Sequence, residues 1–107
     1  MFAILESDWK KFKPLHALAM DRFFQKTNAE IAQRILSTQG THQDRFWNAH
    51  EFACDQRKEA AELFDDPRRS SALLKLAAFC RQGLLTPEEI SPLTPETRQF
   101  IVNILQS

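Results

Sequence analysis

The sequence of 107 residues contains only two glycines, Gly40 and Gly83, and no tyrosine. A Walker A loop or a dinucleotide-binding fingerprint needs several glycines close together, because the backbone must come very near to phosphate. The composition therefore excludes most nucleotide-binding enzymes. The chain also lacks an excess of either charge, with 14 basic and 14 acidic residues. Because affinity for nucleic acid comes largely from Lys and Arg side chains that neutralise phosphates, a nucleic-acid partner is not favoured.

Long apolar runs and a disulfide framework are absent too. The longest uncharged stretches, such as residues 14–20, are much shorter than the roughly 18 to 20 apolar residues that cross a membrane. The beginning of the sequence, MFAILESDWKK, places acidic residues before its lysines and does not resemble a secretory signal. Cys54 and Cys80 lie far apart within helical patterns, which favours reduced, packed thiols. We therefore expect a cytoplasmic protein without membrane contact and without a cofactor.

Helix start and stop signals dominate what remains. Pro14 can open a helix, Thr41 with Asp44 predicts an N-cap, and Gly83 predicts a helix end in the left-handed conformation. Asp-Pro at 66–67 and Thr-Pro at 86–87 and 94–95 predict three more helix starts. We predict an all-α fold in which residues 1–107 form a single-domain bundle: three main antiparallel helices (about 14–37, 42–65 and 67–82), an N-terminal arm before them, and two short C-terminal helices (about 87–91 and 95–105).

Apolar residues at helical spacing predict the buried face of the first two long helices. On the first, the expected face is Ala17, Met20, Phe24, Ile31 and Ile35. On the second, it is Phe46, Trp47, His50, Ala53, Cys54, Arg57, Ala60, Ala61 and Phe64.

Several large apolar residues lie outside these two faces or on the arm. They are the candidate protein-interface residues Trp9, Phe12, Phe23, Phe52 and Leu63. Such residues on neighbouring helices indicate a contact surface, and isologous dimers are the commonest use of one. The alternative is that the arm, which includes Phe2, and the C-terminal helices cover them. The leading hypothesis is a protein of adaptor or regulatory type that binds another protein or itself as a homodimer.

Four polar residues lie on or near the predicted apolar faces, namely Asp21, Asn28, His50 and Arg57. The antiparallel register pairs Asp21 with Arg57, and a polar cleft there is a candidate site for a small anionic ligand or for proton transfer. The structural interpretation is a partly buried ion pair that fixes the helix register, and it is favoured because buried polar groups are usually satisfied internally.

A metal site is a weaker candidate. His50 and Cys54 are four residues apart on one helix, and the register brings Cys80 towards them. Zinc requires three or four such ligands, and no fourth is evident. Buried packing of both thiols is the favoured interpretation, because cysteine is among the most commonly buried residues.

The third helix begins with four residues that could hold an anion, Arg68, Arg69, Ser70 and Ser71. Backbone N–H groups in a first turn favour anions, so two arginines there are expected either to clamp a phosphate or acidic peptide or to pair with Asp65 and Asp66. Three lysines beside Trp9 and Phe12, at positions 10, 11 and 13, are interpreted as a solvated face.

Overall fold

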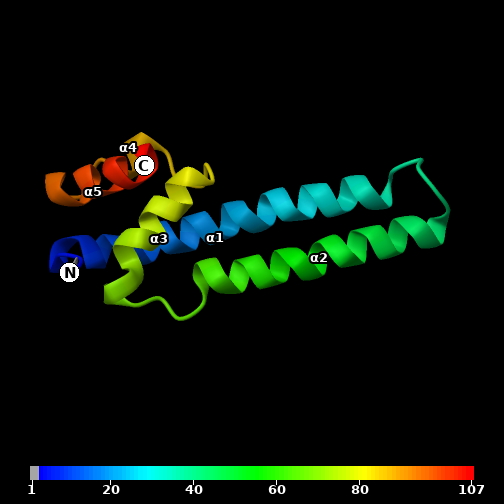
Figure 1. The fold of residues 1–107 in the computed structure, drawn as a ribbon, viewed down its shortest axis with the longest axis horizontal. Coiled ribbons are helices and arrows are strands. Elements are labelled where there is room, and N and C mark those ends of the chain that lie inside the picture. Colours follow the sequence, from blue (N-terminus) through cyan, green and yellow to red (C-terminus); the bar gives the residue numbers. More distant parts are fainter. Residues whose placement is uncertain (1–2) are drawn as a thin grey trace. The chain divides into compact units, whose positions relative to one another are not determined.

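The computed structural model describes residues 3–107, and within this range the chain forms five α-helices and no strand (Figure 1). The helices are α1 (Glu6–Ile35), α2 (His42–Phe64), α3 (Arg69–Arg81), α4 (Pro87–Ile90) and α5 (Pro95–Gln106). The all-α prediction is confirmed. Over these same residues, every helix is too short or too polar to cross a membrane.

Most helix ends follow the predicted local chemistry. Thr41 and Asp44 form a capping box at the start of α2, and Thr86 and Glu89 form another at the start of α4. At the end of α3, Gly83 has φ 71°, its N–H donates to the Cys80 carbonyl, and the Leu84 N–H donates to the Phe79 carbonyl. This hydrogen-bond pair is a Schellman motif, so the predicted stop is confirmed.

The predicted N-terminal arm is wrong for the residues that the structure describes. Helix α1 begins at Glu6, and Pro14 lies inside it rather than at its first position. A proline there removes one backbone hydrogen bond and costs about 3 kcal/mol. The residues before it offset this cost because Ile4, Asp8 and Phe12 are buried. Phe2, which was assigned to the arm, lies outside the described residues.

The chain forms two compact units, and the single-domain interpretation stays a prediction. The first, called here the terminal unit, combines residues 1–20 with residues 66–107. The second, called the hairpin unit, is Asp21–Asp65 and contains the C-terminal part of α1, the turn and α2.

The terminal unit has a dense core in which α3 packs against α5. Its largest fully buried side chains are Phe12, Phe79, Leu76, Leu84, Ile101 and Asp8. The Phe12 and Phe79 rings lie 6.4 Å apart, and His16 contacts both. This core includes one charged residue, which needs hydrogen-bond partners in such a place.

That charged residue, Asp8, joins the beginning of the chain to helix α5. Its carboxylate accepts hydrogen bonds from the Thr94 N–H at 2.9 Å and from the Thr94 and Thr97 hydroxyls, each at 2.6 Å. Thr94 is the N-cap residue of α5 but makes no capping bond with its own side chain, because its hydroxyl donates to Asp8 instead. Burial alone would raise the pKa of Asp8, but the bonds from Thr94 and Thr97 and the charge of Lys11 outweigh it and hold the pKa below its ordinary value.

Candidate protein-binding surface

Helices α1 and α2 of the hairpin unit run antiparallel and face each other through one stripe each (Figure 1). The Phe23 and Phe64 rings meet edge to face at 5.5 Å, and the Thr27 hydroxyl lies 3.5 Å from the Gln56 side-chain oxygen. Nearer the turn, Arg34 donates to Asn48 at 2.9 Å. These contacts fix the register of the two helices.

The predicted buried faces of these helices are wrong for most of their residues, although Ala60 and Phe64 are buried as predicted. The residues that fill the interior of the hairpin are Phe23, Thr27, Ala49, Ala60, Leu63 and Phe64. Of the predicted faces, Met20, Phe24, Ile35, Phe46, Trp47, His50, Cys54, Arg57 and Ala61 are exposed. Small residues such as Ala49 and Ala60 allow the helix axes to approach, which explains why the less aromatic stripe of α2 is the one that faces inward.

The candidate interface residues are corrected in the same way. Phe12, Phe23 and Leu63 are buried, and Phe52 and Trp9 are half-buried. The Arg34 guanidinium covers the Phe52 ring at 4.2 Å from its centroid. The candidate interface residues are therefore buried or half-buried, and another surface of the hairpin unit carries the exposed Phe24, Ile35 and Phe46.

That other surface lies on one side of the hairpin. On α1, Phe24 and Ile35 come directly after Phe23 and Arg34, which are buried or half-buried. On α2, the residues that come directly after buried or half-buried positions are Phe46, His50 and Arg57. Each step along a right-handed helix turns by about 100°. The two helices face each other and run in opposite directions. The residue directly after an inward-facing residue therefore lies on the same side of the hairpin in α1 and in α2.

We call this surface the apolar face. It consists of Phe24, Asn28, Ile31 and Ile35 on α1 and Phe46, His50, Ala53, Arg57 and Ala61 on α2. Phe24 is 39% exposed, Ile35 52% and Phe46 60%. Trp47 at its outer edge is 53% exposed. Spacings of three and four residues along both helices are those of a seam in a helical bundle.

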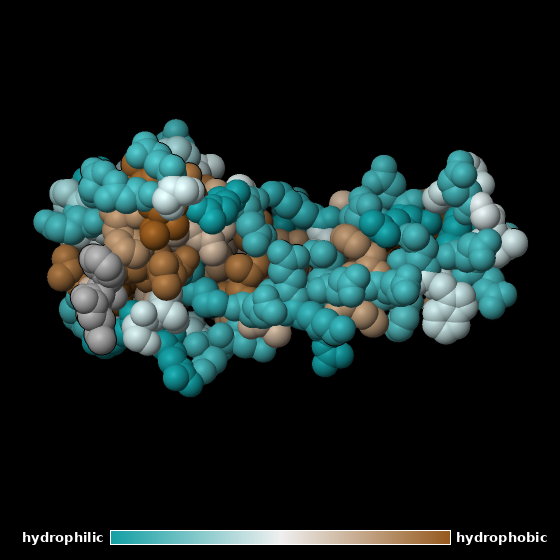
Figure 2. Space-filling view, in the orientation of Figure 1, coloured by the Kyte–Doolittle hydropathy of each residue, from teal (hydrophilic) through white to brown (hydrophobic). Residues whose placement is uncertain are grey.

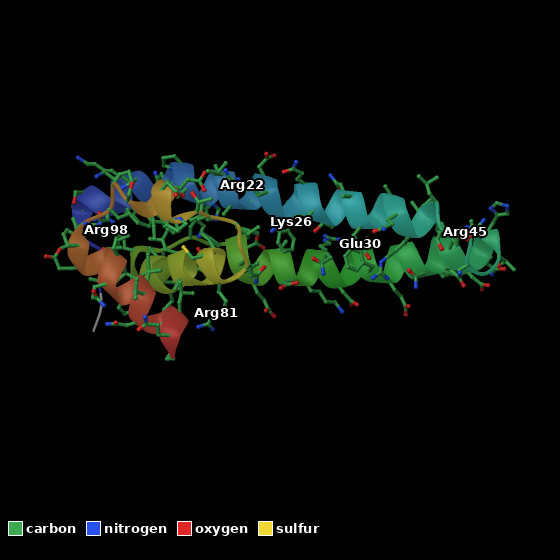
Figure 3. The ribbon with its side chains drawn as sticks, turned by 90° about the horizontal axis from the view of Figure 1, so that it is seen from above. Arg22, Lys26, Glu30, Arg45, Arg81 and Arg98 are labelled. Carbon is green, nitrogen blue, oxygen red and sulfur yellow. The ribbon has the colours of Figure 1, made fainter. Side chains whose placement is uncertain are left out.

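The opposite side of the hairpin is charged and internally paired. In Figure 3, Arg22, Lys26 and Glu30 follow one another along α1. Glu30 accepts a hydrogen bond from Arg34, which also holds Asn48. The view of the hairpin in Figure 2 shows a mostly hydrophilic surface. The hairpin is thus amphipathic from one side to the other.

The end of the apolar face near the turn is aromatic. The Phe46 ring stacks on the His50 ring at 6.1 Å, and Trp47 meets both edge to face. The His50 Nε2 atom lies 3.6 Å from the Cys54 sulfur. Three adjacent rings on an exposed surface are the composition found in the centres of protein interfaces.

The four residues of the predicted polar cleft are Asp21, Asn28, His50 and Arg57, and all are exposed. The expected ion pair between Asp21 and Arg57 does not form in the described part of the chain, where Arg57 has no hydrogen bond or ion pair. Both helices are rotated from the predicted orientation, so these side chains lie on the surface instead of between the helices.

The weak metal candidates were His50, Cys54 and Cys80, and both thiols are free. Residues 3–107 contain no cluster of three or more His, Cys, Asp or Glu side chains that could hold a metal ion. Cys54 is exposed, which corrects its expected packing. Burial, aided by Glu89, raises the pKa of the half-buried Cys80 thiol.

The anion candidates at the start of α3 have partners within the terminal unit. Arg68 pairs with Asp66 at 2.6 Å, which is one of the two expected carboxylates. Arg69 pairs with Glu6 and lies over the Trp9 ring. Ser71 donates to the Arg68 carbonyl, while Ser70 is exposed. Helix α3 begins at Arg69, two residues later than predicted.

No protein family, curated protein or solved structure matches this chain. The residues of the apolar face are therefore the guide to its function.

Proposed function

We propose that this protein acts by binding a protein through the apolar face of its hairpin unit. The supporting observation is that several large apolar side chains of one unit lie together on one side of a two-helix hairpin whose other side is charged. Phe24, Ile35, Phe46 and Trp47 are all more than one third exposed. Contiguous exposed apolar patches on a small chain mark contact sites, whereas single exposed residues need no explanation.

A role of adaptor or regulatory type in the cytoplasm fits this proposal. The free cysteines Cys54 and Cys80 are compatible with a reducing compartment. The described residues present two α-helices with a bundle-type seam and no catalytic cluster of metal-ligating side chains. Binding through a helical surface requires only complementary shape and the removal of apolar area from water.

The test is the size of the complex that the tagged protein forms in native lysate. Wild type should elute from a size-exclusion column well above the mass of one chain, and Phe46→Glu should elute as a single chain. Leu74→Glu is the matched control, because Leu74 is 57% exposed but belongs to α3 of the terminal unit and not to the apolar face. If wild type and Phe46→Glu elute together, the apolar face does not bind a protein.

A further inference from the structure

We propose that the partner of the apolar face is a second copy of this chain, packed face to face about a two-fold axis with the two hairpin turns at opposite ends. This inference rests on the proposed function and specifies its partner. It predicts a four-helix arrangement of two hairpins in which α1 packs on the partner's α1 and α2 on the partner's α2, each pair antiparallel.

The exposed apolar side chains supply a large part of the area that such a pair needs. An aromatic side chain carries about 150–250 Å² of surface, so the exposed fractions of Phe24, Phe46 and Trp47 with that of Ile35 amount to roughly 400 Å² per copy. Two copies together then remove about 800 Å² of these four side chains from water, and the other exposed residues of the face add to this area, towards the roughly 1,000 Å² that a specific interface should exceed.

The register of the hairpin makes the apolar face self-complementary. On α1 the middle of the face lies between Ala29 and Glu30, and on α2 it lies between Ala53 and Cys54. The contact of Thr27 with Gln56 places these two midpoints at the same level along the hairpin. A single two-fold axis through that level therefore maps both helices onto their copies without sliding either one.

This axis brings together residues that fit by size. Phe24 of one copy lies level with Ile35 of the partner subunit, and Phe46 lies level with Ala61 of the partner subunit. A large ring facing a small residue is the alternation that lets side chains of two helices interdigitate.

Arg57 favours one of the two possible orientations. Arg57 is the single charged residue of the apolar face, and within residues 3–107 it is exposed without an ion pair. With the turns at opposite ends, its guanidinium lies beside the partner's His50, next to the ring cluster of Phe46 and Trp47, and aromatic faces attract a guanidinium. With the turns at the same end, Arg57 would meet the partner's α1 between Phe24 and Asn28, where the face offers the exposed ring of Phe24 alone and no carboxylate. The opposed orientation gives the charge the larger aromatic partner.

The first experiment measures the mass of the purified full-length chain by light scattering over a concentration series. Wild type and the control Leu74→Glu should form dimers, and Phe46→Glu should stay monomeric while its circular dichroism spectrum remains helical. Arg57→Ala should weaken dimerisation by roughly tenfold or more, because the two-fold axis repeats the contact. Arg57→Lys, which keeps the charge, should weaken it less.

The second experiment tests the orientation by disulfide cross-linking with oxidised glutathione, in a chain that carries Cys54→Ser and Cys80→Ala. Ala53→Cys, close to the proposed axis, should give a covalent dimer. Ala32→Cys, an exposed position on the outer side of α1, should not.

Each result bears on one part of the proposal. A wild type that is monomeric at high concentration overturns the second copy as partner, and it leaves the proposed function standing if the lysate complex still depends on Phe46. A dimer that survives Phe46→Glu overturns the apolar face as the interface. A Phe46-dependent dimer without an Ala53→Cys cross-link overturns the opposed orientation.

Discussion

The two units solve the problem of burying apolar side chains differently. All the largest fully buried side chains, including Phe12, Phe79 and Leu76, belong to the terminal unit. In the hairpin unit, Phe24, Ile35 and Phe46 stay exposed although it has its own buried stripe. Two helices can bury only the stripe between them, because each has apolar residues on a broader arc than one neighbour covers. The terminal unit therefore buries its largest side chains within its own core, whereas the hairpin unit leaves aromatic side chains exposed along one side.

This contrast between the two units would be wrong if a core residue of the terminal unit and a residue of the apolar face contributed equally to stability. Phe79→Ala should lower the free energy of unfolding by about 3–5 kcal/mol, because Phe79 is fully buried. Phe46→Ala, measured at a concentration too low for association, should change it by less than about 0.5 kcal/mol. Urea denaturation followed by circular dichroism measures both values. A loss of several kcal/mol for Phe46→Ala would show that its ring is needed within a single chain.

The buried carboxylate of the terminal unit gives the next largest expected effect. Asp8→Ala should cost about 3 kcal/mol at neutral pH, because it leaves the Thr94 N–H and two hydroxyls without their acceptor. The pKa of Asp8 is lowered in the folded state, so its contribution is complete above the unfolded value of 3.8 and is lost as the pH falls from there towards the folded pKa.

Asp8→Asn is the variant for the pH series. Its asparagine does not titrate, so the stability difference between wild type and Asp8→Asn should shrink as the pH falls below about 3.8. Urea midpoints at a series of pH values measure this difference. A difference that stays constant through this range would mean that the Asp8 charge contributes nothing.

Each unit has one glycine in a turn, and replacing it should lower stability by a smaller amount. Gly83→Ala should cost roughly 1 kcal/mol, from the left-handed backbone alone, which has φ 71°. Gly40→Ala should cost roughly 2 kcal/mol, because its Cβ would also lie 2.8 Å from the Asp44 carboxylate that closes the capping box of α2. Thermal denaturation of the two variants ranks them, and equal costs would mean that Asp44 moves aside freely.

Two surface arginines should give the smallest effects. Arg34→Ala should cost about 1 kcal/mol, because it removes a cation–aromatic contact and two polar contacts of the hairpin unit. Arg69→Ala should cost less, since its pair with Glu6 in the terminal unit is exposed. Because Arg69 already has this partner, millimolar phosphate should leave the wild-type melting temperature unchanged. A clear rise that is absent in Arg69→Ala would restore the anion-site hypothesis.

The local ends of the helices could be predicted because they depend on a few neighbouring residues. Thr41 with Asp44, and Gly83 with its left-handed φ, act through hydrogen bonds within six residues. The start of α1 could not, because Pro14 favours a helix start locally and distant packing of Phe12 overrides it.

The orientation of the hairpin helices was the main error. Each helix has two stripes at bundle spacing, and the sequence alone favours the more aromatic one. What could have separated them is the row of charged residues before the inward positions of α1, Arg22 before Phe23 and Lys26 before Thr27. Asp8 was missed because its partners Thr94 and Thr97 lie more than 80 residues away along the chain.

The bond between Asp8 and Thr94 also sets an order of events during synthesis on the ribosome. Residues 21–65 leave the ribosome before α5, which follows them in the chain and whose N-cap residue is held by Asp8. Pairing across 86 residues requires a large loop to close, and such contacts form slowly. The residues of both hairpin helices are therefore outside the ribosome before the contacts that close the terminal unit can form.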